Sequence, residues 1–278
     1  MTGNVFQSEK IIRLRHLGRS FMTDPREAVR LVPEGLASYF EHAVDYDIDK
    51  GWEPRLHEWL GAPWPCPELE RGQELWESTG EELEAHGLSF GRHTYGQYSD
   101  ADAALGRAVW CVVLHLHPAV VVETGVARGI TSRVVLEALE HNGEGHLWSV
   151  DLPHPFEPGI RAQTGVAVPP DRRSRWSYVE GSSRRRLPPL LRRLGRVDVF
   201  VHDSLHTARN TRFEMECVGR VLTPGGVMLV DDISTHQGFD DWTRRTAGTR
   251  RLICPSADSE GLFGIVDMCP GARPTAPS

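Results

Sequence analysis

The second half of the chain alternates short β-branched runs with segments of helical periodicity. This alternation is typical of a parallel sheet with helices on both faces, because each parallel connection needs a long crossover that a helix usually supplies. We therefore predict an α/β fold built on a doubly wound, mostly parallel sheet. The predicted strands are residues 119–123, 146–151, 176–180, 197–203 and 225–232, followed by two candidates at 249–255 and 261–268.

The first hundred residues have a different texture, in which helix signals dominate. Helices are predicted there at residues 24–32 and 67–87, and a third at 100–117 leads into the first strand. Between the strands, further helices are predicted at residues 130–143 and 207–222. We expect three parts: a helical N-terminal extension or lid over residues 1–100, a sheet domain over 101–270 and a disordered tail over 271–278.

The charge of the chain is unevenly distributed. Its 31 Lys and Arg against 38 Asp and Glu give a formal net charge of -7. Residues 1–100 hold 18 acids and 10 bases, a balance of -8, whereas residues 101–278 hold 20 acids and 21 bases, a balance of +1. Nucleic-acid binders usually present a basic surface, because they must neutralise phosphates, so no nucleic-acid partner is expected. The nine arginines from Arg172 to Arg196 form either a track for RNA or an acidic substrate or, as we favour, a solvated helix face paired with N-terminal acids.

Cysteine spacing and hydropathy favour a reducing compartment. The cysteines are Cys66, Cys111, Cys217, Cys254 and Cys269. They form no close pair and no metal-type spacing, so neither a disulfide framework nor a zinc knuckle is expected. The N-terminus lacks the apolar core of a signal peptide, and the longest apolar stretch is far shorter than the ~20 residues that span a bilayer. We expect a cytoplasmic protein without a membrane partner.

The N-terminal region is also rich in aromatic residues. Trp52, Trp59, Trp64 and Trp76 lie there, and we expect most of them to pack in a small core rather than line a substrate cleft. The same region offers a surface through which a homo-oligomer could form. The sequence leaves the oligomeric state open.

The segment ETGVARGITS, residues 123–132, lies where the first predicted strand turns into a helix. Gly125 and Gly129 would let the backbone turn tightly and approach a ligand, which the free amides at the helix start would face. A dinucleotide-binding turn would instead carry three glycines in the pattern G-x-G-x-x-G, so pyrophosphate binding is disfavoured. Two glycines at such a turn also occur for packing alone, so this motif is weakly specific by itself.

The order of motifs along residues 101–268 resembles that of the class I S-adenosylmethionine-dependent methyltransferases. ETGVARG is similar to the first motif of the metal-dependent small-molecule O-methyltransferases of the macrocin and cephalosporin-hydroxylase-like groups, with Ala127 in place of the usual middle glycine. The resemblance implies a Rossmann-like sheet with an antiparallel C-terminal strand, and S-adenosyl-L-methionine as the cofactor. Four further motifs match in order: Asp151, EGSS at 180–183, HDSLH at 202–206 and LTPGGVMLVDD at 222–232.

Residues at the predicted strand ends are candidates for binding this cofactor. The glycines would let the chain pass under the methionine portion, and Asp151, 26 residues beyond Gly125, would accept both ribose hydroxyls. The alternative for Asp151 is a helix cap or a turn acid. By the resemblance, Ser182 would lie near the adenine. The candidate cofactor-binding residues are Glu123, Gly125, Gly129, Ser132, Asp151, Ser182 and Asp203.

A second group of acids follows the fourth and fifth predicted strands. Asp203, Asp231 and Asp232 would meet at one sheet edge, where open α/β sheets bind ligands, and would repel one another unless a cation lay among them. Oxygen ligands favour Mg²⁺, Mn²⁺ or Ca²⁺ over zinc. The resemblance implies such a site with these three acids as ligands. The alternative is that Asp231 and Asp232 cap the next segment.

The histidines near these acids differ in their expected roles. His206 and Asp203 are the candidate catalytic residues, with His206 as the general base or, alternatively, packed on its helix. His202 should be buried, because strand alternation points it away from Asp203. His236 could reach an acceptor, and His154 is expected at the surface or as a gate.

These observations favour a methyltransferase that moves a methyl group to a hydroxyl of a small molecule, such as a sugar or natural product, assisted by Mg²⁺ or another divalent cation. Two other classes stay open. One is a nucleotide-binding oxidoreductase on the same sheet, disfavoured by the missing central glycine. The other is a catalytically silent scaffold that retains the cofactor fold. The sequence does not identify the acceptor.

Overall fold

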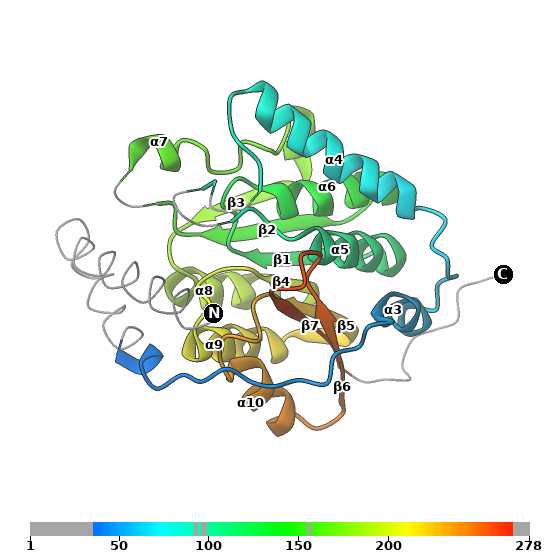
Figure 1. The fold of residues 1–278 in the computed structure, drawn as a ribbon, viewed down its shortest axis with the longest axis vertical. Helices are drawn as coiled ribbons and strands as arrows, with labels where there is room; N and C mark the ends of the chain where they lie inside the picture. The colour runs from blue at the N-terminus through cyan, green and yellow to red at the C-terminus, as the bar shows by residue number, and fades with distance from the viewer. Residues whose placement is uncertain (1–35, 92–93, 96–98, 155–156, 269–278) are drawn as a thin grey trace.

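The computed structural model describes residues 36–91, 94–95, 99–154 and 157–268, which are organised around a seven-stranded sheet (Figure 1). The strand order is β3-β2-β1-β4-β5-β7-β6. Strands β1 to β5 pair in parallel, whereas β7 is antiparallel to both of its neighbours. The predicted mostly parallel sheet with an antiparallel C-terminal strand is confirmed. The strands are β1 (Val120–Thr124), β2 (His146–Asp151), β3 (Trp176–Glu180), β4 (Val197–His202), β5 (Leu222–Val230), β6 (Thr249–Pro255) and β7 (Leu262–Met268).

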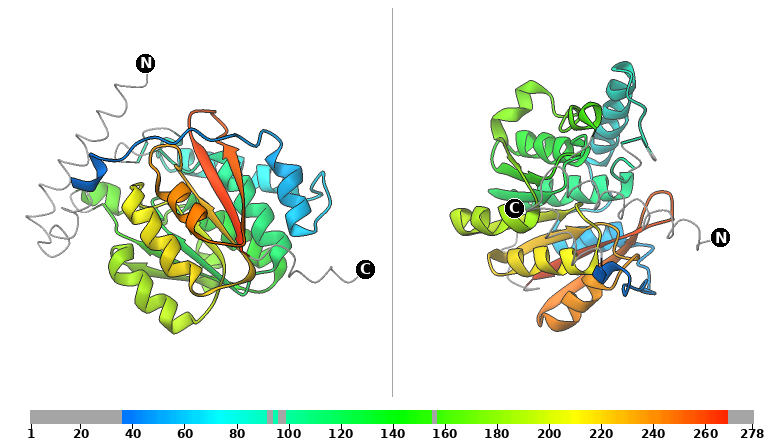
Figure 2. Two further views of the ribbon diagram at one scale, coloured as in Figure 1. Left: turned by 90° about the horizontal axis from the view of Figure 1, so that it is seen from below. Right: turned by 90° about the vertical axis from the view of Figure 1, so that its left-hand side faces the viewer.

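Helices cover both faces of the sheet, as the left view of Figure 2 shows. On one face, α5 and α6 pack on the strands, with α3 and α4 against them. The opposite face carries α8 and α9, and α10 packs against α9. The helices are α3 (Trp52–Leu60), α4 (Leu69–Ala85), α5 (Ala103–Leu116), α6 (Ile130–Asn142), α7 (Pro158–Arg161), α8 (Ser183–Leu194), α9 (Ala208–Gly219) and α10 (Gly238–Arg245), with a 3-10 helix η1 (Pro170–Arg175). None of the described helices is long and apolar enough to cross a membrane.

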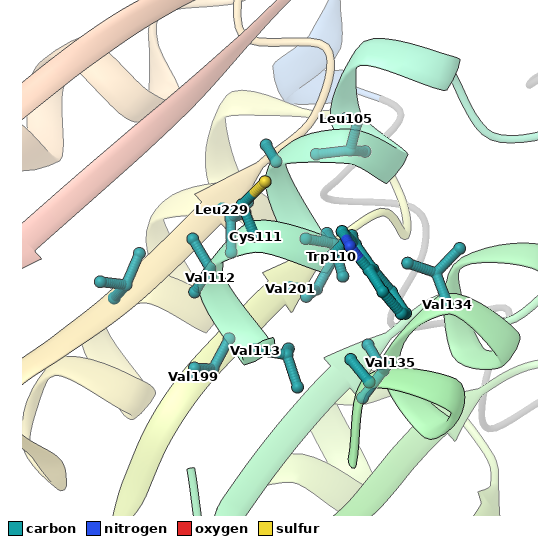
Figure 3. Close-up of a cluster of buried hydrophobic side chains, with 14 of the residues drawn as sticks. Leu105, Trp110, Cys111, Val112, Val113, Val134, Val135, Val199, Val201 and Leu229 are labelled. Atoms are coloured by element: carbon teal, nitrogen blue, oxygen red, sulfur yellow. The ribbon is translucent and has the colours of Figure 1, made fainter. Parts of the chain in front are cut away.

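Helix α5 is the central helix of its layer. Asp102 caps its start, because the Asp102 side chain accepts hydrogen bonds from the amides of Ala104 and Leu105 at 2.8 and 3.2 Å. The helix is buried on nearly all sides, since it is packed between the sheet and helices α3, α4 and α6. Figure 3 shows Trp110 and Val113 of this helix among valines of α6 and β4. Such a helix needs apolar residues on every face, which the run AVWCVVL supplies.

The element boundaries agree with most of the predictions. Strands β2, β3 and β6 begin and end at the predicted residues, whereas β5 begins three residues early, at Leu222. The TPGG segment therefore belongs to the strand, where Leu222 pairs with Val197, and helix α9 is shorter than predicted. Helix α3 has no counterpart among the predictions. The predicted helix at 24–32 and tail at 271–278 lie outside the described residues, and the division into three parts stays a prediction.

The tryptophans of the N-terminal region mostly pack, as predicted. Trp52 and Trp59 are buried and Trp76 is partly buried against the same core, whereas Trp64 is 39% exposed. Trp64 lies beside His57, with ring centroids 4.8 Å apart.

The expected pairing of the arginine-rich flank with N-terminal acids is wrong for the ion pairs of its first helix. Arg172 and Arg175 of η1 pair instead with Glu137 and Glu140 of α6, at 3.0 and 3.1 Å. Glu137 and Glu140 are three residues apart and so lie on the same face of α6. The ion pairs therefore join two neighbouring elements, η1 and α6, rather than the flank and the N-terminal region. The N-terminal acid Glu82 pairs with Arg133, which lies outside the flank.

Candidate cofactor and metal site at the carboxyl edge of the sheet

The site residues predicted from the sequence lie along the carboxyl edge of the parallel strands β1 to β5. Strand β1 pairs with β2 on one side and β4 on the other, so the strand order reverses at this point, which is where open α/β sheets bind their ligands. Backbone hydrogen bonds align the turns: the Asp203 amide donates to the Thr124 carbonyl and the Asp231 amide to the His202 carbonyl, both at 2.9 Å. The candidate residues are thus brought to one edge by the topology.

The turn after β1 depends on glycine. Gly125 has a φ of +85°, and a Cβ at this position would lie 1.8 Å from the carbonyl oxygen of Asp203. Gly129, with a φ of +83°, precedes the first residue of α6. Ala127 also adopts a positive φ, of 47°, in the region that favours glycine. The backbone thus retains the tight turn although the middle glycine is absent.

Glu123 lies in β1 beneath this turn and is fully buried. The hydroxyls of Ser132 and Ser149 donate to its Oε2 at 2.6 and 2.7 Å, whereas its Oε1 is buried without a hydrogen-bond partner among the described residues. Burial raises the pKa of Glu123 to about 8, with smaller contributions from Asp203 and Asp151. The Ser132 hydroxyl is therefore engaged inside the protein, where it orients Glu123.

Asp151 ends β2 beside the glycine turn. Its Oδ1 accepts a hydrogen bond from the Val126 amide at 3.2 Å. Burial raises its pKa to about 6, and the nearby carboxylate of Asp203 adds to the shift. Ser182 lies at the start of α8, and its hydroxyl is buried without a partner within the described ranges. Both side chains thus keep polar capacity at the edge where a ligand would lie.

Asp203, His206 and Asp231 form a compact cluster, in which one ligand-type atom of each lies within 4.8 Å of the others. His206 Nε2 lies 3.5 Å from Asp203 Oδ1 and 3.8 Å from Asp232 Oδ2. Asp232, with a positive φ, lies at the rim and is outside the cluster. The predicted ligand set of three acids thus differs from the cluster, which contains His206 where Asp232 was expected.

The electrostatics of this cluster reflect crowded negative charge. Burial raises the pKa of Asp231 well above its ordinary range, and the carboxylates of Asp232 and Asp203 raise it further. Burial alone would lower the pKa of His206, but the attraction of Asp232, Asp203 and Asp231 outweighs it and raises the value to about 9. The acids therefore favour a positive charge among them.

A buried polar network supports the cluster from below. His202 is fully buried, as predicted, and its Nδ1 lies 2.7 Å from Glu214 Oε2, to which the Thr124 hydroxyl also donates, at 2.5 Å. Burial opposes ionisation of Glu214, but the charge and hydrogen bond of His202 outweigh it and lower its pKa to about 2. The network holds the ends of β1 and β4 to α9.

Two further histidines differ from expectation. His236 is fully buried, with Nε2 3.3 Å from the Thr211 hydroxyl and Nδ1 accepting from the Gly238 amide at 3.2 Å. It is therefore not available to an acceptor, because both ring nitrogens are engaged inside the fold. His154 is 8% exposed, so the prediction of a surface residue is wrong, and its Nδ1 accepts from the Glu157 amide.

Arg128 is a residue of the glycine turn whose role the sequence did not reveal. It is 2% exposed, and its guanidinium donates to the carbonyls of Ser89 and Thr94, both at 2.6 Å, to Gln163 Oε1 at 2.9 Å and to Asp100 Oδ2 at 3.2 Å. These bonds fasten the end of the N-terminal region over the turn. A positive residue between two glycines was the one available signal, and it was consistent with many roles.

The sheet order and the site at its reversal point define the class I methyltransferase fold. Residues 122–233 match the family model of a methyltransferase domain. An O-methyltransferase from Bacillus cereus in complex with SAH is 12% identical, with a TM-score of 0.52 over 70% of this chain and 90% of that one. The O-methyltransferase TomG from Streptomyces achromogenes, involved in tomaymycin synthesis and solved with SAM, is 14% identical with the same TM-score and coverage. No curated protein sequence matches the chain significantly.

Proposed function

We propose that this protein transfers a methyl group from S-adenosyl-L-methionine to a hydroxyl of a small molecule, assisted by a divalent cation. The observation that carries the proposal is that the cluster of Asp203, His206 and Asp231 adjoins the glycine turn: a Cβ on Gly125 would strike the backbone of Asp203. A methyl donor held by the turn would therefore lie next to groups able to bind and deprotonate an acceptor.

The residues at the turn fit this cofactor. Glu123 Oε1 and the Ser182 hydroxyl are buried without partners among the described residues, and a ligand rich in amino and ring nitrogen atoms would satisfy them. Asp151 is held by the backbone amides of Val126 and Leu152, and its carboxylate can accept further hydrogen bonds from the ribose hydroxyls. The fit is therefore supported at three separate positions along the edge.

The acid cluster fits a divalent cation. Asp203 and Asp231 would hold it, with Asp232 close by, and the mutual repulsion that raises the pKa of Asp231 would be relieved. When bound, the cation would polarise the acceptor hydroxyl and lower its pKa. His206 would then accept the proton: its Nε2 faces Asp203, and its Nδ1 is buried without a partner in the described part of the chain. The cation would also offset the negative charge that raises the pKa of His206.

Calorimetry with S-adenosylhomocysteine tests the cofactor half of the proposal. Wild type should bind one equivalent, and Asp151→Asn should weaken binding by about 10- to 100-fold, because hydrogen bonds to a charged group are lost. The exposed acid Asp171 provides the control, Asp171→Asn, which should bind like wild type. If wild type bound nothing, or if Asp151→Asn bound unchanged, the assignment of the cofactor site would be wrong.

Binding of Mn²⁺, followed by its electron paramagnetic resonance signal, tests the cation half without knowledge of the acceptor. Wild type should take up one ion, and Asp231→Asn should lose most of this binding, since a carboxylate ligand is removed. Asp171→Asn again provides the control. Undiminished uptake by Asp231→Asn would show that the acids are structural.

The oxidoreductase alternative predicts a different result. A fluorescence titration with NADH should show no saturable binding to this chain, because the turn after β1 lacks the three-glycine pattern. A catalytically silent scaffold that retains the cofactor fold would bind S-adenosylhomocysteine but would not bind Mn²⁺.

A further inference from the structure

Away from the carboxyl edge, four sulfur and nitrogen donors converge where α3, the segment after it and α5 meet. One donor atom each of His57, Cys66 and His115 lies within 4.8 Å of the others. Cys66 Sγ is 3.4 Å from His115 Nε2, and Cys66 also shares a hydrogen bond with Cys111, which lies one helical turn before His115 on α5. His57, Cys66 and Cys111 are all buried.

His57 is oriented as a metal-binding histidine would be. Its Nδ1 lies 2.8 Å from the carbonyl oxygen of Glu53, an interaction that requires a proton on Nδ1 and so leaves a lone pair on Nε2. His57 Nε2 is buried and has no hydrogen-bond partner among the described residues. Metal-bound histidines almost always donate their other ring N–H to a carbonyl or carboxylate, as here. The lone pair on His57 Nε2 is therefore available to bind a cation.

The sulfur atoms supply ligands that suit the same cation. Cys66 and Cys111 are 5% and 3% exposed, so both thiols are enclosed in the fold. Cys66 Sγ lies among the imidazoles of His57 and His115, and sulfur together with imidazole nitrogen is a donor set that zinc prefers.

We propose that His57, Cys66, Cys111 and His115 bind a structural zinc ion. Zinc takes four Cys and His ligands tetrahedrally, with Zn–S near ~2.3 Å and Zn–N near ~2.1 Å, so ligand atoms lie roughly 3.6 Å apart. The separation of 3.4 Å between Cys66 Sγ and His115 Nε2 is close to this value. The donor set differs from the oxygen-rich acid cluster, which suits harder cations.

The ion would tie α3 and the segment after it to helix α5, which packs on the sheet. His57 comes from α3 and Cys66 from the segment that leads to α4, whereas Cys111 and His115 come from α5, the central helix of its layer. The ligands are spread over nearly sixty residues in two pairs, so their spacing is unlike that of a zinc knuckle. This is why cysteine spacing gave no indication of the site.

Zinc analysis of the full-length protein, purified under reducing conditions, tests the proposal. Wild type should contain about one zinc per chain, and Cys66→Ser and His57→Gln should each contain less than about 0.2. The matched control is Cys254→Ala, which removes a buried cysteine outside the cluster and should keep its zinc. Asp231→Asn should also keep it, because its cation site is separate. Zinc retained by Cys66→Ser, or lost only in Asp231→Asn, would overturn the assignment.

A second measurement uses wild type alone, in case the variants fail to fold. The metal-free, reduced protein should bind one equivalent of Co²⁺ with the visible bands of a tetrahedral site and a thiolate-to-cobalt charge-transfer band, and added zinc should abolish both. Absence of the thiolate band would overturn the proposal. So would a mass 2 Da below that of the reduced chain after purification without reductant, with Cys66 and Cys111 joined in the mapped peptide, since these sulfurs would then form a disulfide.

Discussion

The carboxyl edge of the sheet and the N-terminal segment 36–100 meet at the glycine turn, but they are held in different ways. At the edge, adjacent turns bond through their backbones, as the Gly125 amide does to the Val150 carbonyl. The N-terminal segment makes a few backbone bonds to the rest of the fold, as the Asp49 amide does to the Ile253 carbonyl. Near the turn and at α5, however, it is held by side chains that reach across the fold, such as Arg128 to Thr94 and Cys66 to His115. Backbone hydrogen bonds survive most side-chain substitutions, but not an added Cβ where two backbone segments approach closely. Contacts made by side chains are instead lost when one of a few particular residues is replaced.

The largest expected loss of stability comes from a substitution in the glycine turn at the carboxyl edge of the sheet. Gly125→Ala should destabilise the protein by more than about 4 kcal/mol, because the new Cβ would overlap the Asp203 carbonyl and the backbone could not keep its positive φ without strain. Gly143→Ala is the matched control: Gly143 has a similar φ of +74° but open space around it, so a cost of about 1 kcal/mol is expected. Urea unfolding measures both. Equal costs would mean that the close approach to Asp203 does not constrain the turn.

Next in size is the fastening of the N-terminal segment to the turn. Arg128→Met should cost about 4 kcal/mol, since it removes the positive charge that compensates the buried carboxylate of Asp100 and the donor to two backbone carbonyls. The exposed arginine of the Arg161–Glu180 pair gives the control, Arg161→Met, for which urea unfolding should show a loss below about 1 kcal/mol. Comparable losses in the two variants would show that the segment does not depend on its buried arginine.

The buried network beneath the edge predicts a pH dependence. The pKa of Glu214 is lowered to about 2 in the folded protein, so its contribution to stability is complete above the unfolded value of about 4.5 and is lost as the pH falls through about 2. A shift of this size corresponds to about 3 kcal/mol. The difference in unfolding free energy between wild type and Glu214→Gln should therefore be constant above about pH 5 and shrink below it. A difference independent of pH would contradict the assigned ionisation.

The difference between the carboxyl edge of the sheet and the N-terminal segment also explains which features could be predicted from the sequence. The strands, the glycine turn and Asp151 were accessible, because in a parallel sheet each site residue follows its own strand within a few positions. The metal-type cluster was predicted less well: Asp232 follows Asp231 directly, but its positive φ turns the chain and leaves it outside. Arg128 and the His57–Cys66 grouping escaped prediction, since their partners are distant in sequence and no periodic pattern relates them.

The smallest expected change in stability concerns a half-exposed ion pair of the N-terminal segment, which can be compared with the buried pair of Arg128. Glu53 pairs with Arg107 at 3.2 Å, and both side chains are about one-third exposed. Glu53→Gln should therefore cost only about 0.5 kcal/mol in urea unfolding, and the cost should fall further in high salt, because screening already weakens the pair. Arg128→Met, measured under the same two conditions, should change little with salt, since the side chains of Arg128 and its ion-pair partner Asp100 are both buried. If Glu53→Gln lowered the unfolding free energy as much as Arg128→Met, half-exposed ion pairs would stabilise the segment as strongly as the buried one. The proposed difference between buried and solvent-screened ion pairs would then be wrong.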